Sequence, residues 1–296
     1  MRPDWIALDW GTTHVRAWAM SADGSVLATA QSTAGMGSLG ADGYAPALAA
    51  LTEGWDLPQP CPVLACGMVG ARQGWVDAGY AAVPTAPLSV APVRVPNAPA
   101  QWDARILPGL SQTRPPDVMR GEETQIAGFL ALNPKFDGTL CLPGSHTKWV
   151  QISAGEVVSF QTAMTGEIFA ALGKHTVLRH SIGEGWDDAT FAEAVSDGMS
   201  RPEALASRAF QIRADGLLNG QDAATASARL SGLLIGAELA HARPYWLGMP
   251  VAIIGAPQLS ARYAAALGAQ GVNAIVAKGE ACTLAGLKAA HAAWKE

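Results

Sequence analysis

Two turns rich in glycine and hydroxyl residues have the composition of phosphate-binding loops. Each follows a short apolar run, and a glycine there leaves backbone N–H groups unobstructed while hydroxyls and a cation add further contacts. The residues are Gly11, Thr12 and Thr13 in the first turn and Gly144, Ser145, His146, Thr147 and Lys148 in the second. We expect both turns to bind the phosphates of a nucleotide. The alternative is two ordinary polar hairpin turns, with Lys148 as a solvated strand residue.

Asp9 and Arg16 lie close in sequence to the first turn. We expect Asp9 to hold Mg²⁺ through water, and Arg16 to add positive charge for the phosphates from the next strand. No GxxxxGK[ST] segment competes for the nucleotide.

Glu122 and Glu123 follow Gly121 at the expected start of a helix. A carboxylate placed there can accept a proton from a sugar hydroxyl. The alternative is that both side chains only complement the positive end of the helix dipole. The residues do not decide which glutamate would be the base.

A glycine-flanked loop supplies a candidate substrate site. The candidate substrate-binding residues in this loop are Met68, Val69, Gly70, Arg72 and Trp75. Arg120, later in the sequence, is a further candidate for the same site. Arg72 could bind a carboxylate of the substrate through two parallel hydrogen bonds. The alternative is a glycine loop next to an exposed arginine.

The elements that position the first turn form a β-meander. Apolar runs at 5–10, 15–20 and 25–30 are separated by the polar turn and by Asp23-Gly24, a hairpin signal. The pattern recurs at 139–160, where aligning Gly144 with Gly11 brings the later hairpin glycines, Gly155 and Gly24, to nearly equal distances. This repetition predicts two lobes of related design.

The remaining segments complete an α/β pattern. We expect a buried strand at 62–66, an extended connection at 84–99, which holds five prolines, and a helix at 120–132. A strand at 251–254, a helix at 259–267, a strand at 272–277 and a helix at 280–294 favour parallel strands. Gly232 and Gly236 indicate close helix packing.

Composition narrows the class of protein. With 296 residues, 49% of them hydrophobic, the chain can form two cores, and its net charge of −5 argues against nucleic acid as a partner. Because the N-terminus lacks a signal-peptide pattern and no apolar run spans a membrane, we expect a cytoplasmic enzyme. The four cysteines predict reduced core thiols, and the histidines lack metal-site spacing.

Together the motifs resemble the 2-dehydro-3-deoxygalactonokinase family, within the acetate kinase, sugar kinase, heat-shock chaperone and actin superfamily. The resemblance rests on LDWGTTHVRAW, CGMVGARQGW, LPGL, VMRGEETQIAG, LPGSHTKWV, TAMTGE, LSGLLIGAE and LSARY, which occur in the family's order. It implies an α/β fold of two ribonuclease-H-like lobes, with a nucleotide and substrate cleft between them. The expected lobes are 1–134, joined by the C-terminal helix at 281–296, and 135–280.

The same resemblance implies a sugar-acid kinase. It would use ATP and Mg²⁺ to phosphorylate the terminal hydroxyl of 2-dehydro-3-deoxy-D-galactonate, and Gly255 and Ala256 would begin the turn near adenosine. A phosphohydrolase and a nucleotide-binding regulator are the alternatives. The sequence does not decide the stereochemistry of the acceptor or how the enzyme is regulated. It also leaves the oligomeric state open, and a homodimer is compatible with it.

Overall fold

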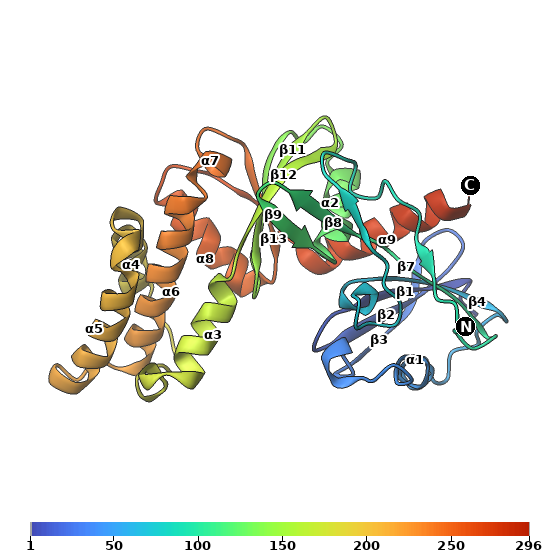
Figure 1. Cartoon of the computed structure of the whole chain (residues 1–296), viewed down its shortest axis with the longest axis horizontal. Helices are drawn as coiled ribbons and strands as arrows, with labels where there is room; N and C mark the ends of the chain where they lie inside the picture. Colours follow the sequence, from blue (N-terminus) through green and yellow to red (C-terminus); the bar gives the residue numbers. More distant parts are fainter. Residues whose placement is uncertain (1, 296) are drawn as a thin grey trace. The chain divides into compact units, whose positions relative to one another are not determined.

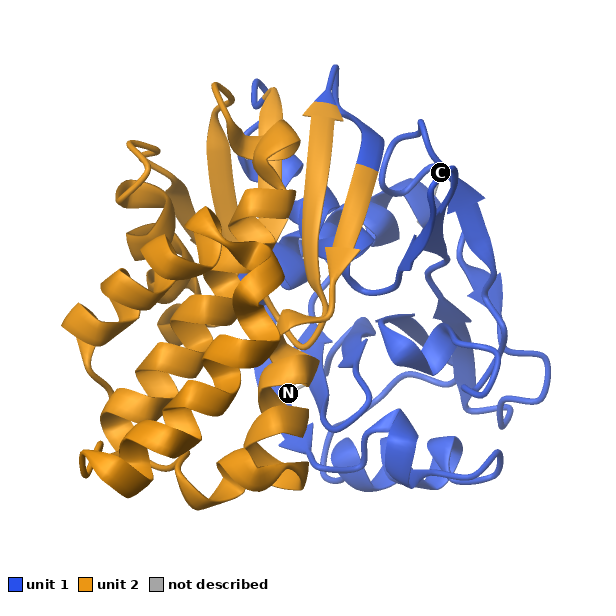
Figure 2. Ribbon diagram, turned by 60° about the vertical axis from the view of Figure 1, so that its left-hand side comes forward, with its two compact units in different colours: residues 1–136, 153–159, 279–296 blue, residues 137–152, 160–278 orange. Residues whose placement is uncertain are grey.

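The structure, a computed structural model, describes residues 2–295, which fold into two compact units. The first unit combines the chain up to Phe136 with Ser153–Ser159 and the segment from Gly279 onward (Figure 2). The second unit contains Asp137–Ile152 and Phe160–Lys278. Each unit has its own sheet and helices, so the α/β class expected from the sequence is confirmed.

The first unit is built on a six-stranded sheet in the order β3-β2-β1-β4-β7-β6. Its strands are β1 (Trp5–Trp10), β2 (Val15–Met20), β3 (Val26–Ser32), β4 (Cys61–Cys66), β6 (Val93–Arg94) and β7 (Trp102–Ile106). The strands β1, β2 and β3 are antiparallel neighbours, which confirms the expected meander, whereas β4 runs parallel to β1 and to β7.

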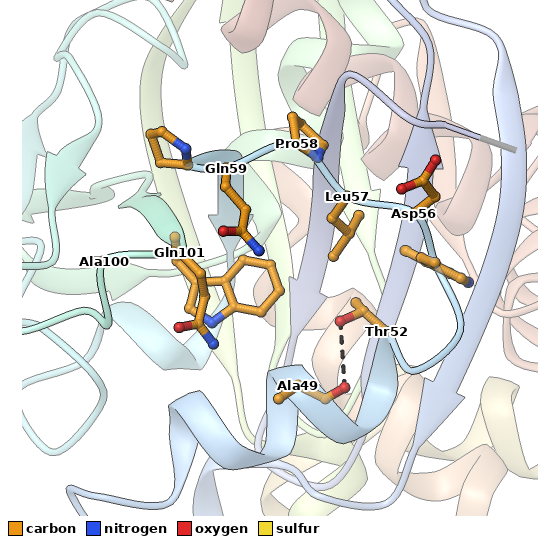
Figure 3. Close-up of a pocket in the computed structure, with 11 residues that line it drawn as sticks. Ala49, Thr52, Asp56, Leu57, Pro58, Gln59, Ala100 and Gln101 are labelled. Carbon is orange, nitrogen blue, oxygen red and sulfur yellow. Dashed lines mark hydrogen bonds between the residues drawn. The ribbon is translucent and has the colours of Figure 1, made fainter.

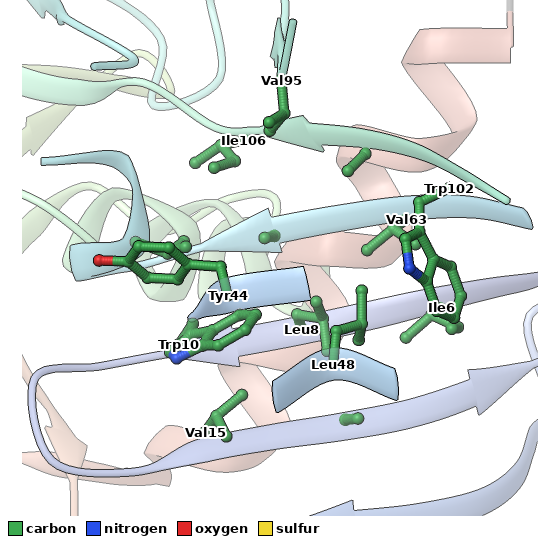
Figure 4. Close-up of a cluster of buried hydrophobic side chains, with 14 of the residues drawn as sticks. Ile6, Leu8, Trp10, Val15, Tyr44, Leu48, Val63, Val95, Trp102 and Ile106 are labelled. Atoms are coloured by element: carbon green, nitrogen blue, oxygen red, sulfur yellow. The ribbon is translucent and has the colours of Figure 1, made fainter. Parts of the chain in front are cut away.

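The alternation of side chains along β1 supplies two cores. Leu8 and Trp10 face α1 (Tyr44–Leu51), whose Tyr44 and Leu48 are buried against them (Figure 4). Trp5 and Ala7 belong to a second cluster on the opposite face. Because successive strand side chains alternate between faces, Asp9 belongs to the second face as well.

Two helices pack on that second face. They are α2 (Glu122–Leu132) and the terminal helix α9 (Gly279–Lys295), which contributes Leu287 to the cluster. A side chain at Gly286 would overlap the carbonyl oxygen of Thr124, and one at Gly128 would overlap that of Cys282. The two helices therefore meet backbone to backbone.

A smaller sheet in the first unit contains β5 (Tyr80–Ala82), β8 (Gly109–Thr113) and β9 (Pro116–Met119).

The second unit repeats the same sheet design. Its strands are β10 (Gly138–Leu142), β11 (Thr147–Ser153), β12 (Glu156–Ala163), β13 (Val251–Gly255) and β14 (Ile275–Lys278), in the order β12-β11-β10-β13-β14. As β1 does with β2 and β4, β10 pairs antiparallel with β11 and parallel with β13. The prediction of two related designs is confirmed.

Helices α3 to α8 accompany this sheet (Figure 1). They are α3 (Thr165–His175), α4 (Asp188–Ser200), α5 (Leu205–Leu218), α6 (Ala223–His241), α7 (Arg243–Trp246) and α8 (Pro257–Gly268). Side chains at Gly232 or Gly236 of α6 would collide with the backbone of α4. The expected close packing at this glycine pair is confirmed.

The four cysteines are as the sequence predicts. Cys61, Cys66, Cys141 and Cys282 are buried free thiols. Within residues 2–295, no helix is both long and apolar enough to cross a membrane.

Candidate functional site

The first glycine-hydroxyl turn joins β1 to β2 at the carboxyl end of β1. The turn is closed by a hydrogen bond from Gly11 N to His14 O of 2.9 Å, and Thr12 and Thr13 are exposed. A neighbouring segment supports it, because Met36 N donates to Gly11 O and Gly37 N donates to Thr12 O. This support was not predicted from the sequence, although the closely spaced glycines at 35 and 37 are a signal for it.

Asp9 and Arg16 are directly opposite each other in the β1–β2 pair. Burial raises the pKa of Asp9 above its usual value, while the charge of Arg16 opposes the shift and that of Glu280 adds to it. Glu280, at the start of α9, lies 3.4 Å from the Arg16 guanidinium. Glu280, which was not a predicted site residue, thus pairs with Arg16 beside Asp9.

Three chain segments converge beside Asp9. Gly67, which follows β4, has φ of +93°, and a side chain there would lie 2.8 Å from the Trp10 carbonyl oxygen. Gly121, which precedes α2, has φ of +100°, and a side chain there would lie 3.3 Å from the Gly67 Cα. Both glycines are required by backbone conformation and close approach. They bring the ends of β1 and β4 together with the start of α2.

The two glutamates of α2 differ in their surroundings. Glu123 is fully buried, and its carboxylate accepts from Gly121 N at 2.6 Å and from Thr124 Oγ1 at 2.9 Å. Glu122 is half-buried and accepts from Arg120 N at 3.0 Å. Both carboxylates therefore satisfy amides at the helix start, as complementing the dipole requires.

Burial also changes the acidity of this region. It raises the pKa of Glu123 from 4.5 to about 7, and the neighbouring charge of Glu122 adds to the shift. Cys66 Sγ lies 4.0 Å from Asp9 Oδ1, and burial raises the thiol's pKa well above its usual value. Glu123 thus has a pKa near the pH at which a general base operates.

The candidate substrate loop is only partly open. The Val69 side chain is in the hydrophobic core, and Trp75 stacks on Tyr44 with ring centroids 5.9 Å apart. Val69 therefore supports the loop from within the core, whereas Trp75 is half-buried and retains exposed surface. Met68 and Gly70 lie in a short 3-10 turn, and Arg72 is 87% exposed and 3.9 Å from Asp77.

Arg120 is a buried cation with unused hydrogen-bond donors. Only 8% of the residue is exposed, Nη2 donates to Gly79 O at 2.9 Å, and the guanidinium lies 4.3 Å from the Tyr80 ring centroid. Nε and Nη1 have no hydrogen-bond partner among the described residues. An anion would complete this arrangement.

The second turn connects β10 to β11 in the second unit. Ser145 and His146 are exposed, and the start of α3 lies against them: Glu167 N donates to Ser145 O at 3.0 Å, and the Glu167 carboxylate lies 2.6 Å from His146 Nε2. Lys148 is 5% exposed, and its ammonium donates to Thr162 Oγ1 at 2.8 Å. The alternative of a solvated lysine is wrong.

Thr147 leads into a buried network that the sequence analysis missed. Its hydroxyl is 2.9 Å from Tyr263 OH, which donates to Glu238 Oε2 at 2.8 Å. Glu238 also accepts from Trp149 Nε1 at 2.8 Å and from the Thr165 hydroxyl. Glu238 is the one acidic residue of the α6 sequence, and a lone acid in an apolar helix was the available signal.

A recess of about 80 Å³ lies beside the second turn. It is lined by Gly144, Thr165, Gly166, Phe169, Ser231, Leu234, Ile235, Leu259, Arg262 and Tyr263. The guanidinium of Arg262 lies 3.5 Å from the Trp186 ring centroid. Gly255 and Ala256, which were expected to bind adenosine, precede α8 and do not line this recess. The residues of α8 that line it begin at Leu259.

A larger cavity of about 810 Å³ occurs in the first unit (Figure 3). Its lining includes Thr52, Asp56, Gln59 and Gln101, and none of the lining residues is a lysine, arginine or histidine. It lies where β4 and β7 begin, whereas Asp9 and Gly67 stand where β1 and β4 end. The absence of cations makes it a poor site for a triphosphate.

Known proteins resemble this chain over almost its whole length. A family model described as 2-keto-3-deoxy-galactonokinase matches residues 9–290. A protein of Rhizobium meliloti (strain 1021) named "Probable 2-dehydro-3-deoxygalactonokinase DgoK1" is 39% identical over 98% of this chain and 97% of its own. The 2-dehydro-3-deoxygalactonokinase of Escherichia coli (strain K12) is 35% identical over 99% of both chains.

Solved structures agree with these sequence matches. A crystal structure from Sinorhizobium meliloti that carries the same kinase name has a TM-score of 0.91 at 39% identity, covering 98% of this chain and 96% of that one. The Acidaminococcus fermentans (R)-2-hydroxyglutaryl-CoA dehydratase component A has a TM-score of 0.53 at 12% identity, covering 99% of both chains. This second likeness concerns the fold alone.

Proposed function

Because the chain belongs to the 2-keto-3-deoxy-galactonokinase family, we propose that it transfers the γ-phosphoryl group of ATP to the terminal hydroxyl of 2-dehydro-3-deoxy-D-galactonate. The products are 2-dehydro-3-deoxy-6-phosphogalactonate and ADP. The family match over residues 9–290 carries this proposal. The proposed use of ATP supports a cytoplasmic location for this reaction.

Phosphate binding is assigned to the two equivalent turns. Gly11–Thr13 and Gly144–Thr147 each end a central strand, and both expose hydroxyl residues. Backbone N–H groups and hydroxyls at such turns bind anionic oxygens. Arg16 and Lys148 provide positive charge next to their respective turns. Phosphoryl transfer depends mainly on this positioning and charge neutralisation.

Asp9 fits the part of a residue that holds Mg²⁺ through water. Magnesium usually keeps several waters and binds one or two carboxylates together with the substrate's phosphates. The described residues contain no group of three or more metal-binding side chains, and Asp9 lies two residues before Gly11 of the first turn. When bound, the ion neutralises charge on the transferring group.

One of the two glutamates is proposed to accept the proton of the acceptor hydroxyl. Glu122 has exposed surface, whereas both oxygens of Glu123 are occupied by Gly121 N and Thr124 Oγ1. Since contact with the hydroxyl is the first requirement of a base, we assign Glu122 as the group that orients and accepts from it. Glu123 fixes the turn from which Glu122 projects.

Arg120 is the proposed receptor for the carboxylate of the acceptor. A buried guanidinium with two unused donors favours an anion far more than the exposed Arg72 does. The recess beside α8 is the proposed site of the adenine base, with Leu259 and Arg262 in its wall. This moves the adenosine assignment from Gly255 and Ala256 into the first turns of α8.

The test is ADP formation by the purified protein with Mg²⁺-ATP and a panel of 2-keto-3-deoxy sugar acids, together with a reaction lacking acceptor. We expect turnover that requires the galactonate-derived acid. Equal turnover with the gluconate-derived acid would contradict the substrate assignment. ADP release at the same rate without acceptor would indicate a phosphohydrolase instead, and no release with any acceptor would indicate a nucleotide-binding regulator.

A further inference from the structure

We propose that Glu238 is a positioning residue that holds the second phosphate turn and the adjoining recess in the arrangement that binds the nucleotide. This inference rests on the proposed function, because it takes that turn and recess as the nucleotide site. Glu238 acts through other residues. The recess lining does not include it.

The carboxylate of Glu238, in the last turn of α6, accepts hydrogen bonds from three other elements. It is 7% exposed on α6 and accepts from Trp149 on β11, from Thr165 on α3 and from Tyr263 on α8. All three groups donate, so the ionised carboxylate matches them best. Burial raises the pKa of Glu238, and these hydrogen bonds oppose that shift.

One arm of the network reaches the turn through Tyr263. A phenol has a single proton, and Tyr263 OH donates it to Glu238 Oε2. The 2.9 Å contact between Thr147 Oγ1 and Tyr263 OH therefore has Thr147 as the donor. The hydroxyl of the second turn is thus bound by a chain that ends on Glu238.

The other arm reaches the turn through Thr165, the first residue of α3. Gly166 lies so close to the turn that a side chain there would overlap the Gly144 carbonyl oxygen, and Glu167 N donates to Ser145 O. The start of α3 therefore packs directly against the backbone of the second turn. The Thr165–Glu238 hydrogen bond fixes the end of the helix that makes these contacts.

The same hydroxyl residues also form walls of the recess. Thr165 and Tyr263 both line it, together with Gly144 of the turn. A negative charge near this turn does not attract phosphate, so the benefit of Glu238 must come from geometry. A network that is fully satisfied favours one arrangement, and losing one member leaves buried donors without partners.

The test is calorimetric titration of ADP into the wild-type protein, Glu238→Gln, Tyr263→Phe and the double variant. Glutamine keeps the shape of Glu238 but replaces one acceptor oxygen with a donor, and phenylalanine removes only the hydroxyl link. We expect each single change to weaken ADP binding about tenfold, the equivalent of about 1.4 kcal/mol. The double variant should bind ADP about as weakly as either single variant, because both act through one chain.

Ser227→Ala is the matched control. Ser227 is also a buried residue of α6, and its hydroxyl exchanges hydrogen bonds with Gly183 at 2.8 and 3.2 Å, away from the recess lining. The control should lower thermal stability and leave ADP affinity unchanged. In steady-state assays, Glu238→Gln should raise KM for ATP about tenfold and change KM for the acceptor less than twofold.

The outcomes separate the two proposals. Failure of the wild-type protein to bind ADP would contradict the proposed function. Normal ADP binding by Tyr263→Phe, or by a folded Glu238→Gln, would overturn the positioning role alone. Equal weakening of ADP and acceptor binding would also overturn it, since that pattern indicates general loss of structure. If Glu238→Gln does not fold, Tyr263→Phe decides the question.

Discussion

At the residue scale, the environment of a side chain decides what it can do, as the adjacent glutamates of α2 illustrate. Glu122 retains exposed surface, while Glu123 is enclosed and its pKa is raised from 4.5 to about 7. Their sequence positions are equivalent for dipole complementation. Burial alone distinguishes Glu122, the proposed base, from Glu123, whose carboxylate is enclosed at the helix start.

The raised pKa of Glu123 predicts how stability depends on pH. Between pH 4.5 and 7 the unfolded chain has lost this proton while the native protein retains it, so the free energy of unfolding falls as pH rises through that window. The full effect is roughly 3 kcal/mol. Glu123→Gln should remove this fall, which urea unfolding at pH 5, 6, 7 and 8 measures. Parallel pH profiles for both proteins would contradict the prediction.

Arg120 and Arg72 form a matched pair for testing carboxylate recognition. Arg120→Gln should raise KM for the sugar acid by at least about tenfold and leave KM for ATP nearly unchanged, since a buried charge-assisted contact is worth about 1.5–3 kcal/mol. Arg72→Gln removes an 87% exposed cation and should change KM for the acceptor less than threefold. Steady-state kinetics with each substrate varied in turn measures both. A larger effect at Arg72 would reverse the assignment.

At the element scale, backbone contact between α2 and α9 sets where the Glu122–Glu123 turn stands. Gly286→Ala would place a methyl group on the Thr124 carbonyl oxygen, next to both glutamates. We expect a loss of about 1–3 kcal/mol in the free energy of unfolding, together with reduced turnover as the start of α2 shifts.

Gly268→Ala is the control for this substitution. Gly268 ends α8 and has open space where a side chain would be added. Alanine there should be neutral or stabilise by up to about 1 kcal/mol, because it favours the helix. Urea unfolding of both variants gives the comparison, and equal effects would show that the α2–α9 contact can relax.

At the scale of the whole molecule, two sheets of one design carry the two turns. Binding of ADP to the native protein should stabilise it by about 2.7 kcal/mol at a concentration of 100 times Kd. We therefore expect a rise of several degrees in Tm with ADP and a smaller one with adenosine, which lacks phosphates. Differential scanning calorimetry measures both, and equal shifts would contradict the assignment of the turns to phosphates.

The sequence by itself determined most elements and their order. Strands β1 and β2, helix α2 and the succession β13, α8, β14 and α9 follow from apolar periodicity and turn glycines, which are local signals. The repeat of the Gly11 pattern at Gly144 also indicated the related sheets, because similar spacing of turn glycines is typical of strands paired in the same order. Family membership followed from the ordered motifs.

Only the tertiary structure decided which polar groups are buried and which partners they have. From the sequence, Lys148 could have been a solvated residue, yet its side chain is buried. The sequence also did not indicate that the Arg120 guanidinium has donors without a partner among the described residues. Glu238 is joined to Trp149 across 89 positions of the chain. Burial and hydrogen bonding depend on segments brought together by folding, so local patterns reveal the residue types and tertiary packing determines their chemistry.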